Sequence, residues 1–223
     1  MCGRFTLAVT PEQLHEAFPW LEATNAPLPH FNIAPSQPVA VIANNNKQRL
    51  DYFIWGLIPS WAKDPKIGNR MINARAETIT EKPSFRTAFR RRRCLIPATG
   101  FYEWKAERDS KNKTPHLIRL KSSEPFAFAG LWENWFSPDC SQILSCTIIT
   151  THPNKLMADI HNRMPVILPQ SAYQTWLAAD EAHPDTLLPL LQPYPDEEMQ
   201  AYPISKLVNN PANDLPECIL PVS

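Results

Sequence analysis

Residues 94–104, CLIPATGFYEW, hold the pattern that decides the fold. Segments 94–97 and 100–104 are short apolar and aromatic runs separated by small residues and a Gly, which is typical of two strands joined by a turn. Three segments of the same kind follow at His116–Leu120, Phe126–Trp132 and Ile143–Thr150. A run of sequential strands predicts an antiparallel or mixed sheet that closes on itself.

Short elements are expected around this sheet. With 24 Pro and only five Gly, the chain is not expected to form long helices. Thr10-Pro11-Glu12-Gln13 has an N-cap, a Pro at the first helical position and a Gln at the third, which predicts a helix to Phe18. Asn44-Asn45-Asn46 predicts a hairpin turn. The hairpin strands are predicted at 38–43 and 49–55, and further helices at 83–93, 151–160, 171–178 and 185–191.

Length and cysteine content limit the class of protein. At 223 residues the chain can bury one sizeable core, so we predict a single α+β domain spanning 1–223. The five Cys form no C-x-x-C pair and the six His are scattered, which argues against a disulfide framework and against a metal site. There is no signal-peptide pattern and no apolar run near ~18 residues. We expect a cytoplasmic protein without a metal or another cofactor.

Charge is unevenly distributed although the formal net charge is zero. Residues 180–223 carry eight acids and one base, whereas residues 63–121 carry sixteen Lys and Arg against six Asp and Glu, a local net charge of +10. A local excess of this kind is what phosphate binding requires, whatever the total charge is. A basic face that only contacts water is the alternative interpretation.

The first residues, MCGRF at 1–5, place a Cys directly after the initiator Met. Aminopeptidases remove Met1 before a small side chain, so we expect Cys2 to start the mature chain with an α-amine beside its thiol. An α-amine titrates near ~7.7–8.0 and a lysine near ~10.4, so the α-amine is the better neutral nucleophile at pH 7. With an aldehyde, this 1,2-aminothiol would form an imine and then a thiazolidine ring. Alternatively, Cys2 is only a small apolar side chain.

Polar side chains in three other segments are candidates for the accompanying chemistry. Asn73 and Arg75 are two residues apart, so in an extended segment both point to one face and can bind a sugar or phosphate oxygen. Glu103 lies among aromatic residues, which should desolvate its carboxyl group, raise its pKa and suit it to proton transfer. His161, near a predicted helix end, suits acid–base chemistry. The alternatives are a solvent-facing Glu and a structural His.

Exposed aromatic and basic residues are the candidates for binding. In WGLIPSWA at 55–62, Trp55 is expected to fill the core, while Trp61 is either a core residue or a platform on which a base stacks. Phe85 and Phe89 are expected to form the buried stripe of the helix at 83–93. Arg86 and the run of four arginines at 90–93 are dense enough for some of them to contact phosphates.

Six segments, taken together and in order, resemble the SRAP family of abasic-site processing proteins, long labelled SOS-response-associated peptidases. They are MCGRF at 1–5, FNIAP at 31–35, WGLIPSWA at 55–62, NARAET at 73–78, RRCLIPATGFYEW at 92–104 and IHNRMPVIL at 160–168. The resemblance covers essentially the whole chain. It implies a twisted, barrel-like, largely antiparallel sheet with short flanking helices, and a monomer that binds single-stranded DNA in a basic groove.

The resemblance also implies roles for individual residues. Cys2 would capture the ring-opened aldehyde of an abasic site as a thiazolidine cross-link, which involves lyase-like Schiff-base chemistry, and Asn73 would orient the sugar or the nucleophile. Glu103 would transfer protons and His161 would assist opening of the deoxyribose ring. The implied DNA contacts are phosphate contacts at Arg4, Arg75, Thr150 and Arg163 and base contacts at Pro35 and Trp61.

Two other classes of function fit part of the sequence. An N-terminal-nucleophile amidase also begins with Cys after removal of Met, uses the thiol as the attacking group and would account for the family's peptidase label. A DNA-binding domain without catalysis would leave the combination of Asn73, Glu103 and His161 unexplained. The basic segment and the Trp61 loop favour DNA as the partner.

Overall fold

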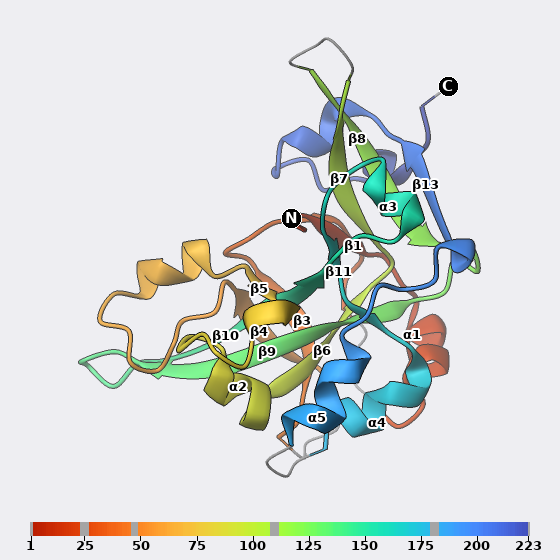
Figure 1. Ribbon diagram of the computed structural model, residues 1–223. Helices are drawn as coiled ribbons and strands as arrows, with labels where there is room; N and C mark the ends of the chain where they lie inside the picture. Colours follow the sequence, from red (N-terminus) through yellow and green to blue (C-terminus); the bar gives the residue numbers. More distant parts are fainter. Residues whose placement is uncertain (1, 23–26, 46–48, 108–111, 179–182, 223) are drawn as a thin grey trace.

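A closed five-stranded barrel forms the centre of the computed structural model, which describes residues 2–22, 27–45, 49–107, 112–178 and 183–222 (Figure 1). Its strands pair in the order β10-β4-β3-β6-β9, and β9 pairs with β10 to close the ring. β10 and β4 run parallel and the other barrel pairs are antiparallel. The strands are β3 (Pro38–Ala43), β4 (Asp51–Trp55), β6 (Arg93–Ala98), β9 (Phe126–Phe136) and β10 (Gln142–Thr151).

A second sheet packs against the barrel. Its order is β13-β8-β7-β1-β2, and every pairing in it is antiparallel. Phe5 of β1 makes edge-to-face contacts with Trp55 and Phe128 of the barrel, at 5.2 and 5.8 Å between ring centroids. The first strand therefore packs its Phe5 ring against the barrel. The strands are β1 (Phe5–Leu7), β2 (His30–Ile33), β7 (Gly100–Ala106), β8 (Lys113–Leu120) and β13 (Met199–Pro203).

Short strands extend the barrel where it faces the start of the chain. β10 pairs along its second half with β5 in parallel and with β11 in antiparallel register, while β12 pairs with β9. Their bounds are β5 (Asn73–Arg75), β11 (Met164–Pro165) and β12 (Ile167–Leu168). A barrel with one antiparallel sheet and a few short helices confirms the predicted α+β class.

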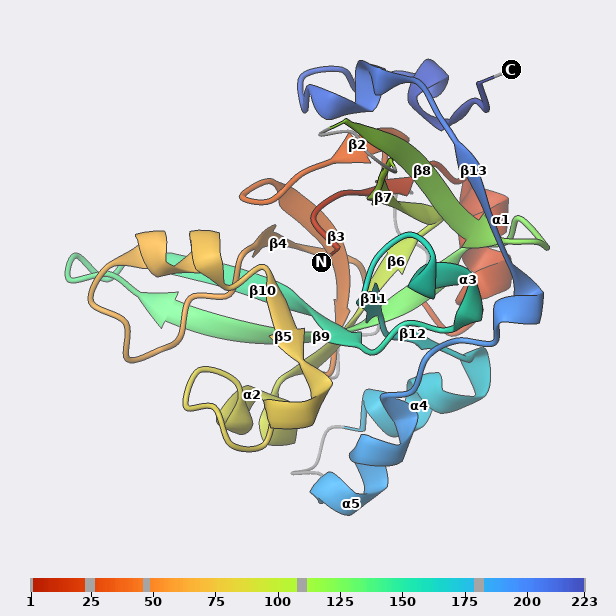
Figure 2. The same ribbon diagram turned by 45° about the horizontal axis from the view of Figure 1, so that its top comes forward.

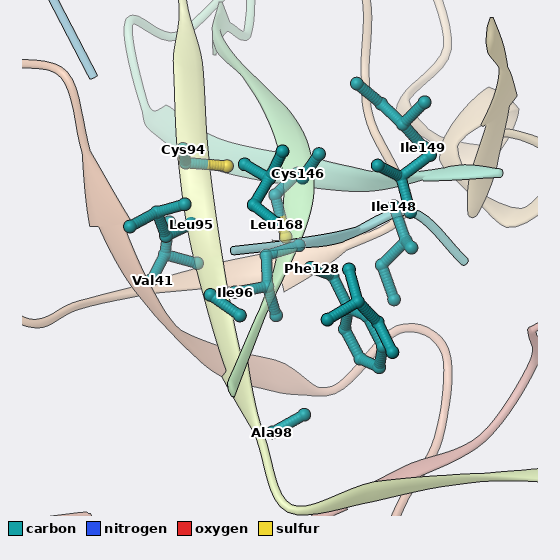
Figure 3. Close-up of a cluster of buried hydrophobic side chains, with 14 of the residues drawn as sticks. Val41, Cys94, Leu95, Ile96, Ala98, Phe128, Cys146, Ile148, Ile149 and Leu168 are labelled. Atoms are coloured by element: carbon teal, nitrogen blue, oxygen red, sulfur yellow. The ribbon is translucent and has the colours of Figure 1, made fainter. Parts of the chain in front are cut away.

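Apolar side chains from the barrel strands and from β12 meet in the interior, where Figure 3 shows the side chains of Cys94, Ile96, Phe128, Cys146 and Leu168 together. At one point the packing requires a glycine. A Cβ on Gly130 would lie 2.8 Å from the Cys94 Sγ and 2.9 Å from the Ile96 Cδ1, closer than atoms in a packed core can approach.

Helices are short, as the high Pro content predicts. The first begins with the predicted capping box, in which Thr10 and Gln13 bond reciprocally. The α-helices are α1 (Pro11–Ala17), α2 (Arg86–Arg91), α3 (Lys155–Ala158), α4 (Tyr173–Trp176) and α5 (Pro184–Leu187). The 3₁₀ segments are Pro65–Arg70, Ala76–Thr78, Gln170–Ala172, Leu188–Leu190, Asp196–Glu198, Lys206–Asn209 and Pro216–Ile219. Among the described residues, no helix is long and apolar enough to cross a membrane.

Two helix predictions are wrong in extent. Thr151 does not cap a helix, because it is the last residue of β10, where it pairs with Met164. Asn154 caps α3 instead, since its side chain accepts from the backbone N–H of Met157. The helix predicted for 83–93 ends at Arg91, since Arg93 already pairs with Leu131 of β9.

The tail returns to the first strands. Ile204 and Val208 pack with Tyr102 and Leu117 on the outer face of the second sheet. Asp214 accepts hydrogen bonds from the backbone N–H groups of Phe31 and Asn32. This part of the acidic tail therefore lies beside β2.

Candidate functional site

Cys2 lies where the second sheet meets the barrel. Its side chain is completely buried, and its Sγ lies 4.0 Å from the backbone oxygen of Arg4. Asn73 of β5 donates a 2.8 Å hydrogen bond from its Nδ2 to the Cys2 carbonyl oxygen. Asn73 is itself held in register with Ile148 of β10. A barrel strand therefore positions the backbone of Cys2.

The other polar atom of the Asn73 side chain has no partner. Its Oδ1 is buried and, within the described part of the chain, accepts no hydrogen bond. A buried acceptor without a donor costs about 1–3 kcal/mol. This oxygen belongs to the same side-chain amide group that donates to Cys2. A hydrogen-bond donor that entered the site, such as an amine or a sugar hydroxyl, would satisfy it.

Glu103 of β7 shares this site. Its side chain is 4% exposed, and burial raises the pKa of its carboxyl group above the ordinary range, while the charge of His161 acts in the opposite direction. Burial likewise raises the pKa of the Cys2 thiol far above its ordinary value, and the charge of Glu103 adds to that effect. Because Glu103 interacts electrostatically with both residues, the three groups form one site.

His161 follows α3, and the turn after it orients its ring. The Nδ1 of His161 lies 3.0 Å from the backbone nitrogen of Arg163, whose N–H can donate to it, and 3.2 Å from the Arg163 carbonyl oxygen. The turn that makes these contacts ends in β11, which pairs with Thr150 and Thr151 of β10. The backbone of Arg163 therefore holds the Nδ1 edge of the imidazole.

Arg163 and Thr150, both predicted to hold phosphates, contact each other and a carboxylate that the sequence analysis did not consider. The two terminal nitrogens of Arg163 bond to both carboxylate oxygens of Glu77, at 2.5 and 3.0 Å. Arg163 also donates to the Thr150 carbonyl oxygen at 2.6 Å, and the Thr150 side chain is completely buried. Glu77 lies in the segment NARAET, so this family motif was the signal that could have identified it.

The Arg4 guanidinium also contacts other groups of the protein. Its Nη1 donates to Asn32 Oδ1 and to the Val208 backbone oxygen, both at 2.7 Å, and its guanidinium lies over the Trp104 ring at 5.8 Å. Burial lowers the pKa of the Arg4 guanidinium. Asn32 in turn donates to three carbonyl oxygens of the tail, those of Val208, Asn210 and Asn213. The sequence analysis assigned no role to Asn32 or to this segment of the tail.

Arg75, Trp61 and Pro35 differ in exposure. The Arg75 side chain is exposed at the end of β5, while that of Pro35 is half-buried. Trp55 fills the core as predicted, whereas Trp61 is 58% exposed. Trp61 borders a hollow of about 330 Å³ whose lining includes the cationic residues Lys63, Lys66 and Arg70. An exposed indole beside cations is a suitable surface for a stacked base.

Among the described residues, no group of three His, Cys, Asp or Glu is arranged to hold a metal ion. The site offers a buried carboxyl group, an imidazole, a carboxamide and a thiol, which are groups for proton transfer and nucleophilic attack.

The family model of SOS response associated peptidase (SRAP) matches residues 1–211 of the chain. The chain belongs to the SRAP family. Among the relatives of this SRAP protein is the abasic site processing protein YoqW of Bacillus subtilis, which is 51% identical over 98% of this chain and 99% of its own. The abasic site processing protein HMCES of Xenopus tropicalis is 30% identical over 98% of this chain and 78% of its own.

Solved structures share the fold of this SRAP protein. A crystal structure of a Bacteroides thetaiotaomicron protein covers both chains completely with a TM-score of 0.89 at 27% identity. One from Bordetella bronchiseptica covers 92% of this chain and 100% of its own, with a TM-score of 0.77 at 26% identity. The barrel with its second sheet is therefore the SRAP fold.

Proposed function

We propose that this protein processes abasic sites in single-stranded DNA by forming a covalent cross-link between the ring-opened sugar and Cys2. The observation that carries the proposal is the convergence of Cys2, Asn73, Glu103 and His161 at one buried site. The names of the relatives YoqW and HMCES, both called abasic site processing proteins, support the same substrate.

The chemistry begins with removal of Met1, which makes Cys2 the first residue. The neutral α-amine attacks the aldehyde carbon of the open sugar and forms a carbinolamine. Loss of one water gives an imine, and addition of the thiol to the imine carbon closes a thiazolidine, with the thiol proton ending on nitrogen. The balance is one water released for each cross-link formed.

Two residues have the properties that the proton transfers require. Burial raises the pKa of Glu103 and so favours its protonated form relative to an exposed carboxyl group, which suits Glu103 to protonate the departing water of the carbinolamine. An imidazole can transfer a proton, so His161 can supply one to the ring oxygen when the sugar opens. Asn73 would hold the backbone of Cys2 and offer its free Oδ1 to the amine or to a sugar hydroxyl.

The alternative, an amidase in which the thiol of Cys2 attacks first, is disfavoured by the environment of the thiol. Thiol nucleophiles react as thiolates, and burial raises the pKa of the Cys2 thiol, so little thiolate forms near neutral pH. The proposed order avoids this difficulty because the amine attacks first. Ring closure then involves a thiol held next to an electrophilic imine carbon.

The experiment is intact mass spectrometry of the protein after mixing with a single-stranded oligonucleotide that carries one abasic site. We expect one species with the mass of the Met1-free protein plus the oligonucleotide minus one water. An oligonucleotide whose aldehyde has been capped with methoxyamine is the control and should give no adduct. If protein of confirmed Met1-free mass gives no adduct with the uncapped strand, the proposal is wrong.

A further inference from the structure

The fold places the arginines of residues 86–93 in three different environments. Arg93 is completely buried, and its guanidinium donates to backbone oxygens of Trp176, Phe89 and Ala178. Arg92 forms an ion pair at 2.8 Å with Glu133, a side chain in β9 that is 6% exposed. These two arginines stabilise the protein and are not part of an open basic surface.

The remaining arginines line one groove. Arg86, Arg90 and Arg91 are exposed and, together with Thr80 and Thr87, line a hollow of about 440 Å³ along α2. No acidic side chain is among these lining residues. Arg86 and Arg90 are four residues apart on one short helix, and like charges at this spacing destabilise a helix by a few tenths of a kcal/mol. A bound polyanion would relieve that repulsion.

The first residue that lines the groove follows shortly after the candidate site along the chain. Asn73 contacts Cys2, Arg75 is exposed at the end of the same strand, and Thr80 of the groove follows five residues later. In both Figure 1 and Figure 2, β5 lies between the start of the chain, drawn in red, and α2. The five residues from Arg75 to Thr80 span at most ~18 Å, so the groove begins within about five nucleotides of Arg75 at ~3.4 Å per nucleotide of a strand.

We propose that this arginine groove, lined by Thr80, Arg86, Thr87, Arg90 and Arg91, binds the phosphates of the DNA strand on one side of the abasic site. The inference rests on the proposed function and extends it, because it assigns the protein a footprint that reaches beyond the lesion on one flank. The guanidinium groups neutralise phosphates and the threonine hydroxyls donate to their oxygens, so the contact has no base specificity.

The affinity should therefore depend on the length of one flank only. For single strands, each phosphate contact contributes about 0.7 to the magnitude of the slope of log affinity against log salt concentration. At ~0.1 M salt, one contact therefore raises the affinity about 5-fold relative to ~1 M salt. Two contacts, from Arg86 and Arg90, should raise affinity about 25-fold once the flank is long enough to reach the groove. Extension of the opposite flank should give no such step.

The test uses the full-length protein and oligonucleotides that carry a tetrahydrofuran abasic analogue, which has no aldehyde and binds reversibly. Affinity is measured by fluorescence anisotropy while either flank is lengthened in turn. The double variant Arg86→Ala/Arg90→Ala should lose the step, and its salt slope on the long strand should fall by about 1.4. Lys121→Ala removes an exposed charge on the second sheet and serves as the control that keeps the step.

The inference is overturned if the double variant retains the length-dependent step of the wild-type protein, or if the wild-type protein shows no step on either flank. Neither result affects the proposed cross-link, which is read out separately by mass spectrometry with aldehyde-bearing DNA. Conversely, absence of a cross-link would refute the proposed function while the reversible binding step could still be measured. Because Ala is compatible with a helix, the double variant should be folded, and thermal unfolding is the measurement that checks this.

Discussion

The side chain of Asn73 donates a 2.8 Å hydrogen bond to the backbone carbonyl oxygen of Cys2. The contact joins a residue that precedes β1 to a residue of β5, 71 positions away, and it holds the residue that would carry the nucleophilic amine. Because β10 fixes Asn73 in register, the closed barrel determines where the start of the mature chain lies. Positioning of this kind lowers the entropic cost of the reaction.

Loss of that hydrogen bond should slow the cross-linking reaction. Asn73→Ala leaves the buried Cys2 carbonyl without its donor, at a cost of about 1–3 kcal/mol, so the rate at saturating DNA should fall roughly 5- to 100-fold. The measurement is single-turnover cross-linking followed on denaturing gels. A rate equal to that of the wild-type protein, in a variant that unfolds at the usual temperature, would show that Asn73 does not position the nucleophile.

Cys2→Ser separates the two functions assigned to the first residue. The variant keeps the α-amine, so it should form an imine with abasic DNA that borohydride traps, yet little heat-stable adduct. Retention of Met1, forced by a bulky residue inserted between Met1 and Cys2, converts the Cys2 amine into an amide and should abolish the heat-stable adduct even though the thiol survives. Cross-linking by a Met1-retaining protein at the wild-type rate would mean that the α-amine is not the nucleophile.

Glu103→Gln should reduce activity and raise stability. Burial raises the pKa of Glu103 in the folded state, so the stability from its neutral form is present at low pH and is lost as pH rises from about 4.5 through the raised pKa. The Gln variant cannot ionise and should lose less stability over that window. Its cross-linking should be about 10²- to 10⁴-fold slower. Melting temperatures between pH 4 and pH 8 that are parallel for the two proteins would contradict the assignment.

Glu77→Gln tests whether Arg163 is available to a phosphate. The Glu77 carboxylate is 49% exposed, so losing its ion pair with Arg163 should change the free energy of unfolding by no more than about 1 kcal/mol. The freed guanidinium should then bind DNA phosphate, raising single-strand affinity by about 5-fold at ~0.1 M salt. An unchanged affinity, measured by anisotropy, would indicate that Arg163 has only a structural role.

Arg93→Met should destabilise the protein. The variant leaves several buried carbonyl oxygens without donors, so we expect a loss of about 3 kcal/mol and a melting temperature about 6–12 °C lower. Arg86→Met, an exposed position in the same segment, is the matched control and should change the free energy of unfolding by less than about 0.5 kcal/mol. Equal melting temperatures for the two variants would contradict the division of the arginine run.

Features that depend on neighbouring residues could be predicted from the sequence. The capping box at Thr10, the hairpin strand at 38–43 and the strands on either side of Gly100 all occur as expected, because turn chemistry and alternation act over a few residues. The raised pKa of Glu103 was predicted, but for the wrong reason: Tyr102 and Trp104 point to the opposite face of β7 and pack with the tail, while Glu103 is buried beside Cys2. The resemblance to the SRAP family added the prediction of a barrel-like sheet with short flanking helices.

Only the tertiary structure decided which polar groups meet. Arg4 and Val208 are 204 residues apart and Glu77 and Arg163 are 86 apart, so no local pattern could reveal either contact. The run of arginines at 90–93 looks uniform in sequence, yet barrel closure buries Arg93, pairs Arg92 with Glu133 and leaves Arg90 and Arg91 on the groove. The physical reason is that the side-chain environment is set by strands that pair across the barrel, and such pairing is decided by the packing of the entire core.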